Sequence, residues 1–202
     1  MLTLALIAQK GGVGKTTIAA ALAVAHQRAG AQVALVDLDQ QGSAAAWSRL
    51  RGGQPPEVIP AHPPSLRSTL GAAKKNGTSL TLIDTPPRER AGAAEAAKHA
   101  DLVLVPCQPS MPDLLALPPT LEVVAGTRAV VLLNRCPARG SWTAEATAAV
   151  HQLTAELCPV VLGQRVAHAK AFVRGQSAQE FEPNSPAAAE VAALYTWLQE
   201  AR

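Results

Sequence analysis

Aromatic side chains, cysteines and long apolar runs are all scarce in this chain of 202 residues. Aromatic residues make up only 3% of it, so the core must be built largely from alanine and branched aliphatic side chains. Cys107, Cys136 and Cys158 are odd in number and widely spaced, which predicts reduced thiols and argues against a disulfide framework. No uncharged apolar run of about 18 residues occurs, so no membrane span is expected.

Charge is sparse as well, at 16% of the residues against 48% apolar residues, which is typical of a globular chain. A chain of this length buries about 70% of its unfolded surface, so we expect residues 1–202 to form a single domain. The net charge of +3 permits contact with nucleic acid or acidic partners but does not require it. The apolar N-terminal stretch is short, lacks a basic start and leads into a glycine-rich loop, so we expect a cytoplasmic protein without a signal peptide.

Short apolar runs alternate with helical patterns along the chain. We predict strands at residues 2–8, 32–37, 58–59, 80–84, 102–106, 129–134 and 160–162. We predict helices from the glycine-rich loop to about residue 29 and at residues 43–50, 65–75, 90–99, 112–124 (broken at Pro118–Pro119), 143–157 and 186–201. A loop through Gly175 and Pro183 is expected before the last helix.

The pattern predicts an α/β fold, because strand runs that are apolar on both faces and separated by helices are typical of a parallel sheet. We therefore expect a mostly parallel, twisted sheet with helices on both faces. Ligands bind such sheets at the carboxyl ends of the strands. The informative polar segments all fall at those ends, at residues 9–17, 37–43, 84–87, 106–110 and 134.

Residues 9–17 read QKGGVGKTT and lie between a predicted strand and a predicted helix. The three glycines allow positive φ, so backbone N–H groups can surround phosphate oxygens at the helix N-terminus. Lys15 can reach the β- and γ-phosphates, and the Thr16 hydroxyl can ligate Mg²⁺. Gln9 stands where the standard P-loop pattern has its first glycine, and Lys10 adds a second lysine at the start of the loop.

KGGVGKTT resembles the deviant Walker A loop of the ParA/MinD class of ATPases. The resemblance implies a P-loop NTPase fold, ATP and Mg²⁺ as ligands, and a homodimer that forms when ATP is bound. In that class the early lysine, here Lys10, reaches across the dimer interface to the partner's nucleotide, and we carry over both Lys10 and Lys15 as catalytic. The nucleotide-binding residues implied by the resemblance are Gly11, Gly12, Val13, Gly14, Lys15, Thr16 and Thr17.

The segment VALVDLDQQGSA, residues 33–44, ends a predicted strand with two aspartates. It resembles the family's D-x-D-P-Q segment, which implies that Asp39 is the catalytic carboxylate that positions water toward the γ-phosphate. Gln40 stands where the family usually has proline. The alternative interpretation is that Asp37 and Asp39 cap the helix that starts near Ser43.

LTLIDTPP, residues 80–87, is an apolar strand that ends in aspartate, as in the Walker B pattern. Asp84 is therefore predicted to contact Mg²⁺ through a bound water. VPCQPS and LLNRCP, further along the chain, resemble the family's V-P-x-x-P-S segment and its base-contacting strand end. Asn134 offers one donor and one acceptor to adenine. A turn-forming asparagine at a strand end is the alternative.

The resemblance runs from residue 2 to about residue 137 and implies a partition or positioning ATPase of the short subclass without an N-terminal helix-turn-helix domain. Its ATP-bound homodimer is expected to be nucleoid-associated, binding DNA without sequence preference. A ParB-like or small centromere-binding or adaptor protein is expected to stimulate hydrolysis. The cargo stays open between a plasmid, a chromosome and a protein assembly. By region only, the candidates for DNA contact are Arg165, Lys170 and Arg174.

A membrane-associated, MinD-like regulatory ATPase is the alternative function, and it would need a closing helix with an exposed apolar face. Val191, Leu194, Tyr195 and Leu198 instead form one stripe, which predicts a helix that packs on the core and no membrane partner. A reductase that shares this loop would need paired interface cysteines for an iron–sulfur cluster, and the cysteine spacing does not provide them. A nucleotide-binding switch without hydrolysis stays open because of Gln40.

Overall fold

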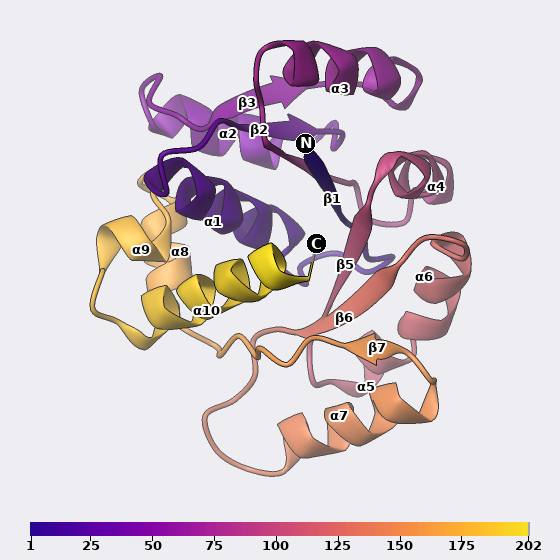
Figure 1. Cartoon of the computed structure of the whole chain (residues 1–202). Helices are drawn as coiled ribbons and strands as arrows, with labels where there is room; N and C mark the ends of the chain where they lie inside the picture. Colours follow the sequence, from indigo (N-terminus) through magenta and orange to yellow (C-terminus); the bar gives the residue numbers. More distant parts are fainter. Residues whose placement is uncertain (202) are drawn as a thin grey trace.

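The computed structural model describes residues 1–201, which contain a seven-stranded sheet with the order β3-β2-β4-β1-β5-β6-β7 (Figure 1). Every pair of neighbouring strands in this sheet is parallel. The sheet confirms the predicted α/β class. Its strands are β1 (Leu2–Leu6), β2 (Val33–Asp37), β3 (Glu57–Pro60), β4 (Leu80–Asp84), β5 (Leu102–Cys107), β6 (Ala129–Leu133) and β7 (Glu156–Leu157).

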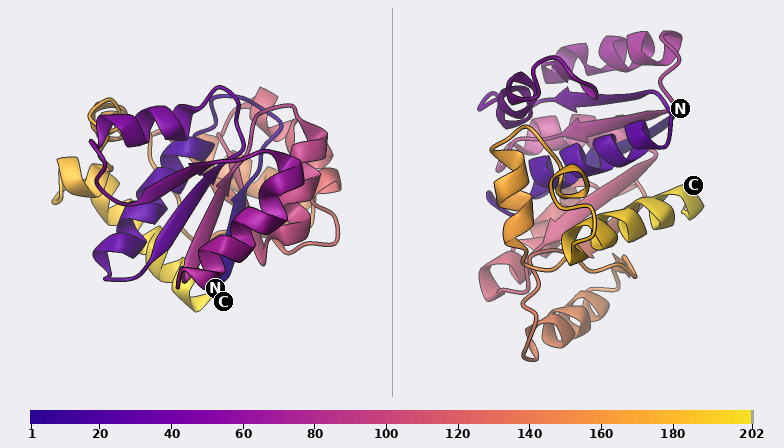
Figure 2. Two further views of the ribbon diagram at one scale, coloured as in Figure 1. Left: turned by 90° about the horizontal axis from the view of Figure 1, so that it is seen from above. Right: turned by 90° about the vertical axis from the view of Figure 1, so that its left-hand side faces the viewer.

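Helices cover both faces of the sheet, as predicted (Figure 2). One face packs against α1 (Lys15–Arg28), α2 (Ser43–Leu50) and α10 (Pro186–Glu200). The other face packs against α3 (Leu66–Lys75), α4 (Arg90–His99), α6 (Leu117–Val123) and α7 (Trp142–Gln152). The shorter helices are the 3₁₀ turn Pro63–Ser65, α5 (Met111–Leu114), α8 (Val166–Phe172) and α9 (Ala178–Phe181).

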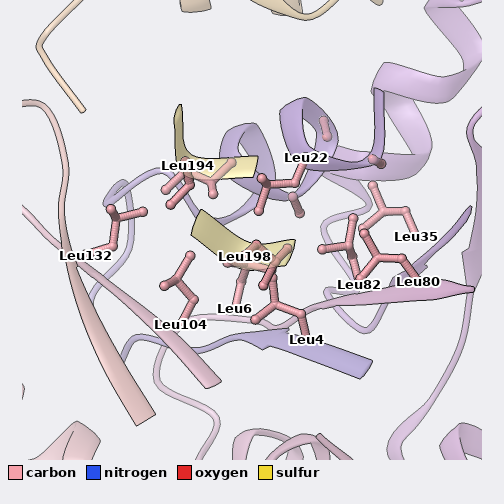
Figure 3. Close-up of a cluster of buried hydrophobic side chains, with 14 of the residues drawn as sticks. Leu4, Leu6, Leu22, Leu35, Leu80, Leu82, Leu104, Leu132, Leu194 and Leu198 are labelled. Atoms are coloured by element: carbon pink, nitrogen blue, oxygen red, sulfur yellow. The ribbon is translucent and has the colours of Figure 1, made fainter. Parts of the chain in front are cut away.

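Alternate residues of each strand supply the two cores. Leu4 and Leu6 of β1 point toward α1 and α10, where Leu198 lies beside them in a cluster that also contains Leu22 and Leu194 (Figure 3). Ala5, between the two leucines, lies in the core on the opposite face. Because both faces are covered, every position of β2, β4 and β5 is buried, which explains why these strand runs are continuously apolar instead of alternating.

The strand register aligns the polar strand ends. Asp84 at the end of β4 is paired with Asp37 at the end of β2 and with Leu6 at the end of β1. The glycine-rich loop follows β1 directly, and Asn134 follows β6. The carboxyl ends of five neighbouring strands, β2, β4, β1, β5 and β6, therefore bring the segments that the motifs singled out to one edge of the sheet.

The helix predicted at residues 112–124 is two helices, and the break lies before the two prolines instead of at them. α5 ends at Leu114 and α6 begins at Leu117. Pro118 and Pro119 lie in the first turn of α6, where a backbone N–H has no partner within the helix, so their missing donors cost little there.

The C-terminal third departs from the predictions in three places, two of which lie between residues 143 and 162. The helix predicted at residues 143–157 ends at Gln152, and Thr154 has a left-handed φ of 53°. The last strand is Glu156–Leu157, so the prediction of a strand at 160–162 was wrong. Leu162 still donates a backbone hydrogen bond to Leu133 at 3.0 Å, which places this segment beside the end of β6.

The predicted loop through Gly175 and Pro183 contains α8 and α9 as well. A capping box of Ser177 and Glu180 starts α9, and it is a local signal that the sequence does contain. The last helix, α10, begins behind Ser185, whose hydroxyl accepts the N–H of Ala188 at 3.2 Å. Among residues 1–201, no helix has the length and apolar character that crossing a bilayer requires.

Candidate functional site

The loop between β1 and α1 combines left-handed backbone with open space. Gly12 and Gly14 have φ values of 78° and 99°. A Cβ atom added to Gly12 would meet no described atom within 4 Å, whereas one added to Gly14 would lie 2.4 Å from Nδ2 of Asn134. Gly14 is the N-cap of α1, and no side chain caps that helix end. The loop therefore offers backbone donors and room for an anion, as a phosphate cradle requires.

Lys15 begins α1 and is almost buried, with 7% of its surface exposed. Its Nζ donates two long hydrogen bonds, to the carbonyl oxygens of Ala8 at 3.4 Å and Lys10 at 3.5 Å. Burial lowers the pKa of Lys15, although the charges of Asp84 and Asp39 oppose the shift. An ammonium with such weak partners is well suited to a multiply charged phosphate. The phosphate-binding role of Lys15 stays a prediction.

Asp84 is fully buried at the end of β4. Its Oδ2 accepts a hydrogen bond from the Thr16 hydroxyl at 2.6 Å, while Oδ1 has no partner within the described chain. Burial raises the pKa of Asp84 to about 7, in spite of the Thr16 hydrogen bond and the Lys15 charge. The structure thus brings together the two residues that were predicted to hold Mg²⁺.

The donor set at Asp84 and Thr16 fits Mg²⁺. An unpartnered carboxylate oxygen beside a hydroxyl suits a hard cation that keeps several of its waters. Residues 1–201 contain no group of three or more His, Cys, Asp or Glu side chains that could form a protein-only metal site. The remaining Mg²⁺ ligands would therefore be waters and phosphate oxygens, as in nucleotide sites.

The two aspartates after β2 differ in their contacts. Asp37 is buried, and its carboxylate accepts the N–H groups of Asp39 at 3.0 Å and Ala45 at 3.1 Å. Asp37 thus ties the loop to the first turn of α2, as the capping interpretation expected. Asp39 is half-buried and accepts the N–H of Gln41 at 2.9 Å. Its charge acts on Lys15, which places it at the site, and its water-positioning role stays a prediction.

Lys10 points to a different partner from Lys15. Its Nζ forms an ion pair with Oδ2 of Asp113 at 2.5 Å, and its side chain is 37% exposed while that of Asp113 is 3% exposed. The Ser110 hydroxyl donates to the same carboxylate oxygen at 2.5 Å. Lys10 is therefore held by its own chain in this structure. Its predicted contact with a partner's nucleotide stays untested.

Sequence reasoning missed two residues that contact the loop. Asp113, the partner of Lys10, is the first acidic residue after the VPCQPS segment and lies in the first turn of α5, which is the only local signal for it. Gln108 lies inside that segment, and its Nε2 donates to the carbonyl of Gly12 at 3.0 Å. Gln108 lies in the loop after β5 and Asp113 in the helix that follows it, so this segment supports the glycine-rich loop from the side.

A cavity of about 520 Å³ lies between α1, the end of β6 and α8. Its lining includes Gly14, Thr17, Asn134 and Arg165. The Asn134 amide donates to the carbonyl of Val13 at 2.7 Å, so it also holds the glycine-rich loop in place. The cavity offers space beside the loop for the rest of a nucleotide, and the contact of Asn134 with adenine stays a prediction.

The three candidates for DNA contact do not share one environment. Arg165 caps α8 and forms an ion pair with Glu190, its Nη2 lying 2.7 Å from Oε1. Lys170 and Arg174 are exposed near the other end of α8, where Arg174 donates to the Lys170 carbonyl at 2.8 Å and lies over the Phe181 ring. The glutamate already neutralises Arg165, whereas the other two cations are exposed. DNA contact stays a prediction for all three.

Solved structures with the same fold include an McdA and a MinD protein. Apo McdA of Cyanthece has a TM-score of 0.79 and 19% identity, and the match covers 100% of this chain and 99% of that one. The cell division ATPase MinD of Pyrococcus furiosus has a TM-score of 0.80 and 22% identity, with the same coverage. At these identities the likeness establishes the fold alone.

Sequence relatives are named for positioning and partitioning. Maintenance of carboxysome distribution protein A of Gloeobacter kilaueensis is 38% identical over 134 residues, which are 64% of this chain and 61% of that protein. The protein of the same name from Halothiobacillus neapolitanus is 28% identical over 93% of this chain and 91% of its own length. The chromosome-partitioning ATPase Soj of Thermus thermophilus is 34% identical over 52% of this chain and 54% of its own.

The family model for the CobQ/CobB/MinD/ParA nucleotide binding domain matches residues 4–178, which include the glycine-rich loop, both aspartate-bearing strand ends and Asn134. The match therefore extends well beyond the loop that first suggested the resemblance. The chain belongs to this family of nucleotide-binding domains, the family of the ParA- and MinD-type ATPases.

Proposed function

We propose that this protein is an ATPase that dimerises when ATP is bound, binds nucleoid DNA without sequence preference and thereby positions a cargo. A partner protein on the cargo, ParB-like or a small adaptor, stimulates hydrolysis and so releases the dimer from DNA. Two findings support this proposal: the family to which the chain belongs, and the partitioning and positioning roles in the names of its relatives.

The observation that carries the proposal is the separation of the two loop lysines. Lys15 is buried at the base of the glycine-rich loop, while the side chain of Lys10 is over one third exposed and, within residues 1–201, is held by an ion pair with Asp113. A loop that bound nucleotide within one chain would need only the first of these. An additional, accessible lysine at the loop entrance supports a role toward a second molecule, here the nucleotide of a partner protomer.

Each polar residue at the strand ends has a place in this function. Thr16 and Asp84 would hold Mg²⁺, Asp84 through a bound water, and the ion when bound would neutralise charge on the phosphates. Lys15 and the loop N–H groups would bind the β- and γ-phosphates. Asp39 would orient the attacking water, because its carboxylate lies at the site but is not consumed by the capping contacts that occupy Asp37.

Binding to a random-sequence DNA duplex tests the proposal. The full chain is titrated with the duplex in ATP, in ADP and without nucleotide, at low and raised salt, with Lys15→Ala as the control. We expect binding only with ATP, falling steeply as salt rises because phosphate contacts release counterions. Equal binding in all three nucleotide states, or binding by Lys15→Ala, would contradict the proposal.

A membrane-associated role is the other outcome to distinguish. Val191, Leu194 and Leu198 of α10 are buried against the core, so this helix has no apolar stripe left for a bilayer. Flotation of the ATP-bound chain with anionic phospholipid vesicles should therefore recover little protein. Dimerisation with ATP but binding to vesicles instead of DNA would transfer the assignment to the MinD-like alternative.

The cargo class follows from which partner stimulates turnover. A protein assembly is supported by the carboxysome-distribution relative that matches 91% of its own length, while a chromosome is supported by the Soj relative that matches 54% of its own length. ATP turnover of the chain should rise when the cargo-bound partner protein is added together with DNA. A partner that binds a specific DNA sequence indicates a plasmid or a chromosome as the cargo, and a partner that binds a protein assembly indicates that assembly as the cargo.

A further inference from the structure

Helix α2 directly follows the loop that carries Asp39, and its one large buried side chain anchors it to the segment 172–180. Trp47 is fully buried and stacks on Phe172 of α8, with ring centroids 6.2 Å apart and an interplanar angle of 24°. Its Nε1 donates to the carbonyl of Gln176 at 3.2 Å. The helix that continues from the nucleotide site is thus attached to the region between α8 and α9.

Arg51, one residue beyond α2, makes a second and stronger attachment. Its side chain is 5% exposed and its guanidinium lies 4.8 Å from the centre of the Trp47 ring. Nη1 and Nη2 each donate to one oxygen of Glu180, both at 2.9 Å, and Nη1 also donates to the Gly175 carbonyl at 2.6 Å. A bidentate pair of this kind fixes orientation as well as distance.

Gly175 brings the two main chains together at this point. It has a φ of +67°, and a Cβ atom there would lie 2.5 Å from the Arg51 nitrogen and 2.6 Å from the Leu50 carbonyl carbon. Backbone meets backbone, so neither segment can slide past the other without breaking the contact. We call Trp47, Arg51, Gly175 and Glu180 together the α2 clamp.

The other end of α2 is tied to the Asp39 loop. One carboxylate, that of Asp37, accepts the N–H groups of both Asp39 and Ala45, at 3.0 and 3.1 Å. Ala45 lies in the first turn of α2, and Arg51 follows its last. An eight-residue helix is about 12 Å long and has no internal hinge, so the connection from Asp39 to the clamp is short and stiff.

On its far side the clamp reaches the exposed cations of α8. Gly175 immediately follows Arg174, whose Nη1 donates to the Lys170 carbonyl and whose guanidinium lies 4.9 Å from the centre of the Phe181 ring in α9. Glu180 also accepts the N–H of Ser177 at 2.8 Å, which closes the cap of α9. The same residues that hold α2 therefore shape the α8–α9 surface.

We infer that Arg51 is a positioning residue that joins α2 to the segment 172–180 and so transmits the position of the Asp39 loop to the α8–α9 surface. The inference rests on the proposed function, in which nucleotide acts on the Asp39 loop and a ligand of the surface responds. A packed, bidentate contact moves as one body or breaks, which makes it suitable for transmitting a displacement. Coupling of this kind is measured as a response of the α8–α9 surface to nucleotide.

Amide hydrogen exchange measures that response in the full chain, with Mg²⁺ and a non-hydrolysable ATP analogue or with neither. In the wild type we expect the analogue to slow exchange in the loop 9–17 and to change it in 166–181. In Arg51→Ala the change at 9–17 should persist, and the change at 166–181 should fall by at least half. Arg128→Ala is the matched control, because it removes an exposed ion pair with Glu156 at the opposite edge of the sheet.

Glu180→Gln keeps an acceptor for Arg51 and the cap of Ser177, so it should retain most of the change at 166–181, while Glu180→Ala should lose it. ATP turnover adds a second readout: Arg51→Ala should lower kcat several-fold with KM within about twofold, because the phosphate loop is untouched. Arg51→Lys serves if Arg51→Ala does not fold. The inference is overturned if the nucleotide-dependent change in hydrogen exchange at residues 166–181 survives in Arg51→Ala. It is also overturned if Arg51→Ala does not fold and the change survives in both Arg51→Lys and Glu180→Ala.

The proposed function and the inference fail in different ways. Absence of any change at 9–17 in the wild-type chain overturns the proposed function, and the inference with it. A wild-type chain that responds at 9–17 but not at 166–181 overturns the inference alone.

Discussion

Two close approaches in this molecule each involve a glycine. One lies at the edge of the sheet that carries the glycine-rich loop, Asp84 and Asn134, which we call the site edge, and the other lies at the α2 clamp. A Cβ atom on Gly14 would lie 2.4 Å from the side-chain amide of Asn134, whereas one on Gly175 would lie 2.5 Å from the backbone nitrogen of Arg51. The Asn134 amide can rotate once its hydrogen bond to the Val13 carbonyl is broken, but a backbone nitrogen moves only with α2. The site edge is thus built to adjust around a ligand, and the clamp is built to stay fixed.

The same difference shows in the buried charges of the two regions. At the site edge Asp84 has an oxygen without a partner in the described chain, and Lys15 has only two long hydrogen bonds. At the clamp both oxygens of Glu180 are paired with Arg51. Unsatisfied buried charge costs stability and is typical of a ligand-binding site, while satisfied charge is typical of a structural contact.

The largest effect should come from the site edge and should leave the fold intact. Lys15→Ala removes the cation at the base of the loop, and we expect ATP turnover to fall by at least about 100-fold, the loss typical of removing one preorganised charge from a reacting group. Turnover of purified protein measures it, and circular dichroism checks the fold. Wild-type turnover in this variant would mean that the loop is not the nucleotide site.

A variant at the α2 clamp should destabilise the protein, although the clamp is not part of the nucleotide site. Gly175→Ala adds left-handed strain and a backbone clash, so we expect the free energy of unfolding to fall by about 2–4 kcal/mol in urea denaturation. Gly30→Ala is the matched control, because Gly30 has a φ of +81° and no described atom within 4 Å of an added Cβ. That variant should lose only about 1–2 kcal/mol. Equal losses in both would show that the close approach adds nothing.

The stability of the folded chain should depend on pH through the buried carboxyl group of Asp84 at the site edge. The pKa of Asp84 is about 7 in the folded chain against an ordinary 3.8, so the folded state holds a proton that the unfolded state releases between these values. Stability without nucleotide should therefore fall as pH rises through this window, by up to about 1.4 kcal/mol per pH unit. Asp84→Asn should remove most of that slope, and the remainder comes from Asp37, whose pKa burial also raises. A wild-type slope identical to that of the variant would contradict the buried, protonated carboxyl.

The smallest effect should lie on the surface beyond the clamp. Lys170→Ala removes one exposed cation, so we expect a modest loss of DNA affinity, the same for all sequences, and a salt slope reduced by about one. Fluorescence anisotropy over a series of salt concentrations measures both. Lys98→Ala, which removes an exposed lysine from α4 on the other face of the sheet, should change neither. An unchanged slope in Lys170→Ala would place the DNA contact elsewhere.

The sequence predicted the site edge well, because its signals are local. The bounds of β4 and α4 agree with the predicted 80–84 and 90–99, and glycines, a lysine and a threonine between a strand and a helix indicate a phosphate loop by themselves. The sequence did not predict which other residues these side chains contact. Asp113 lies 103 positions from Lys10, and no short-range pattern relates them.

The C-terminal third was predicted less well because tertiary contacts decide its form. α8 and α9 have seven and four residues, too short for hydrophobic periodicity to distinguish from a loop. They are held by contacts over long distances in the chain, such as Arg51 with Glu180 and Arg165 with Glu190. The strand predicted at 160–162 has the composition of a strand but lies beyond the ladder, whose last pairing involves Glu156 and Leu157.

The sequence by itself therefore determined the parallel sheet, the two covering layers and the glycine-rich loop, because apolar periodicity and glycine conformation act within a few residues of the chain. Only the tertiary structure decided which carboxylates are satisfied, where Lys10 rests, and how α2 is joined to α8 and α9. These features depend on which distant segments meet at the edges of the sheet. A hydrogen bond between two segments, or a glycine that lets two main chains approach closely, has an effect only after the segments are in contact.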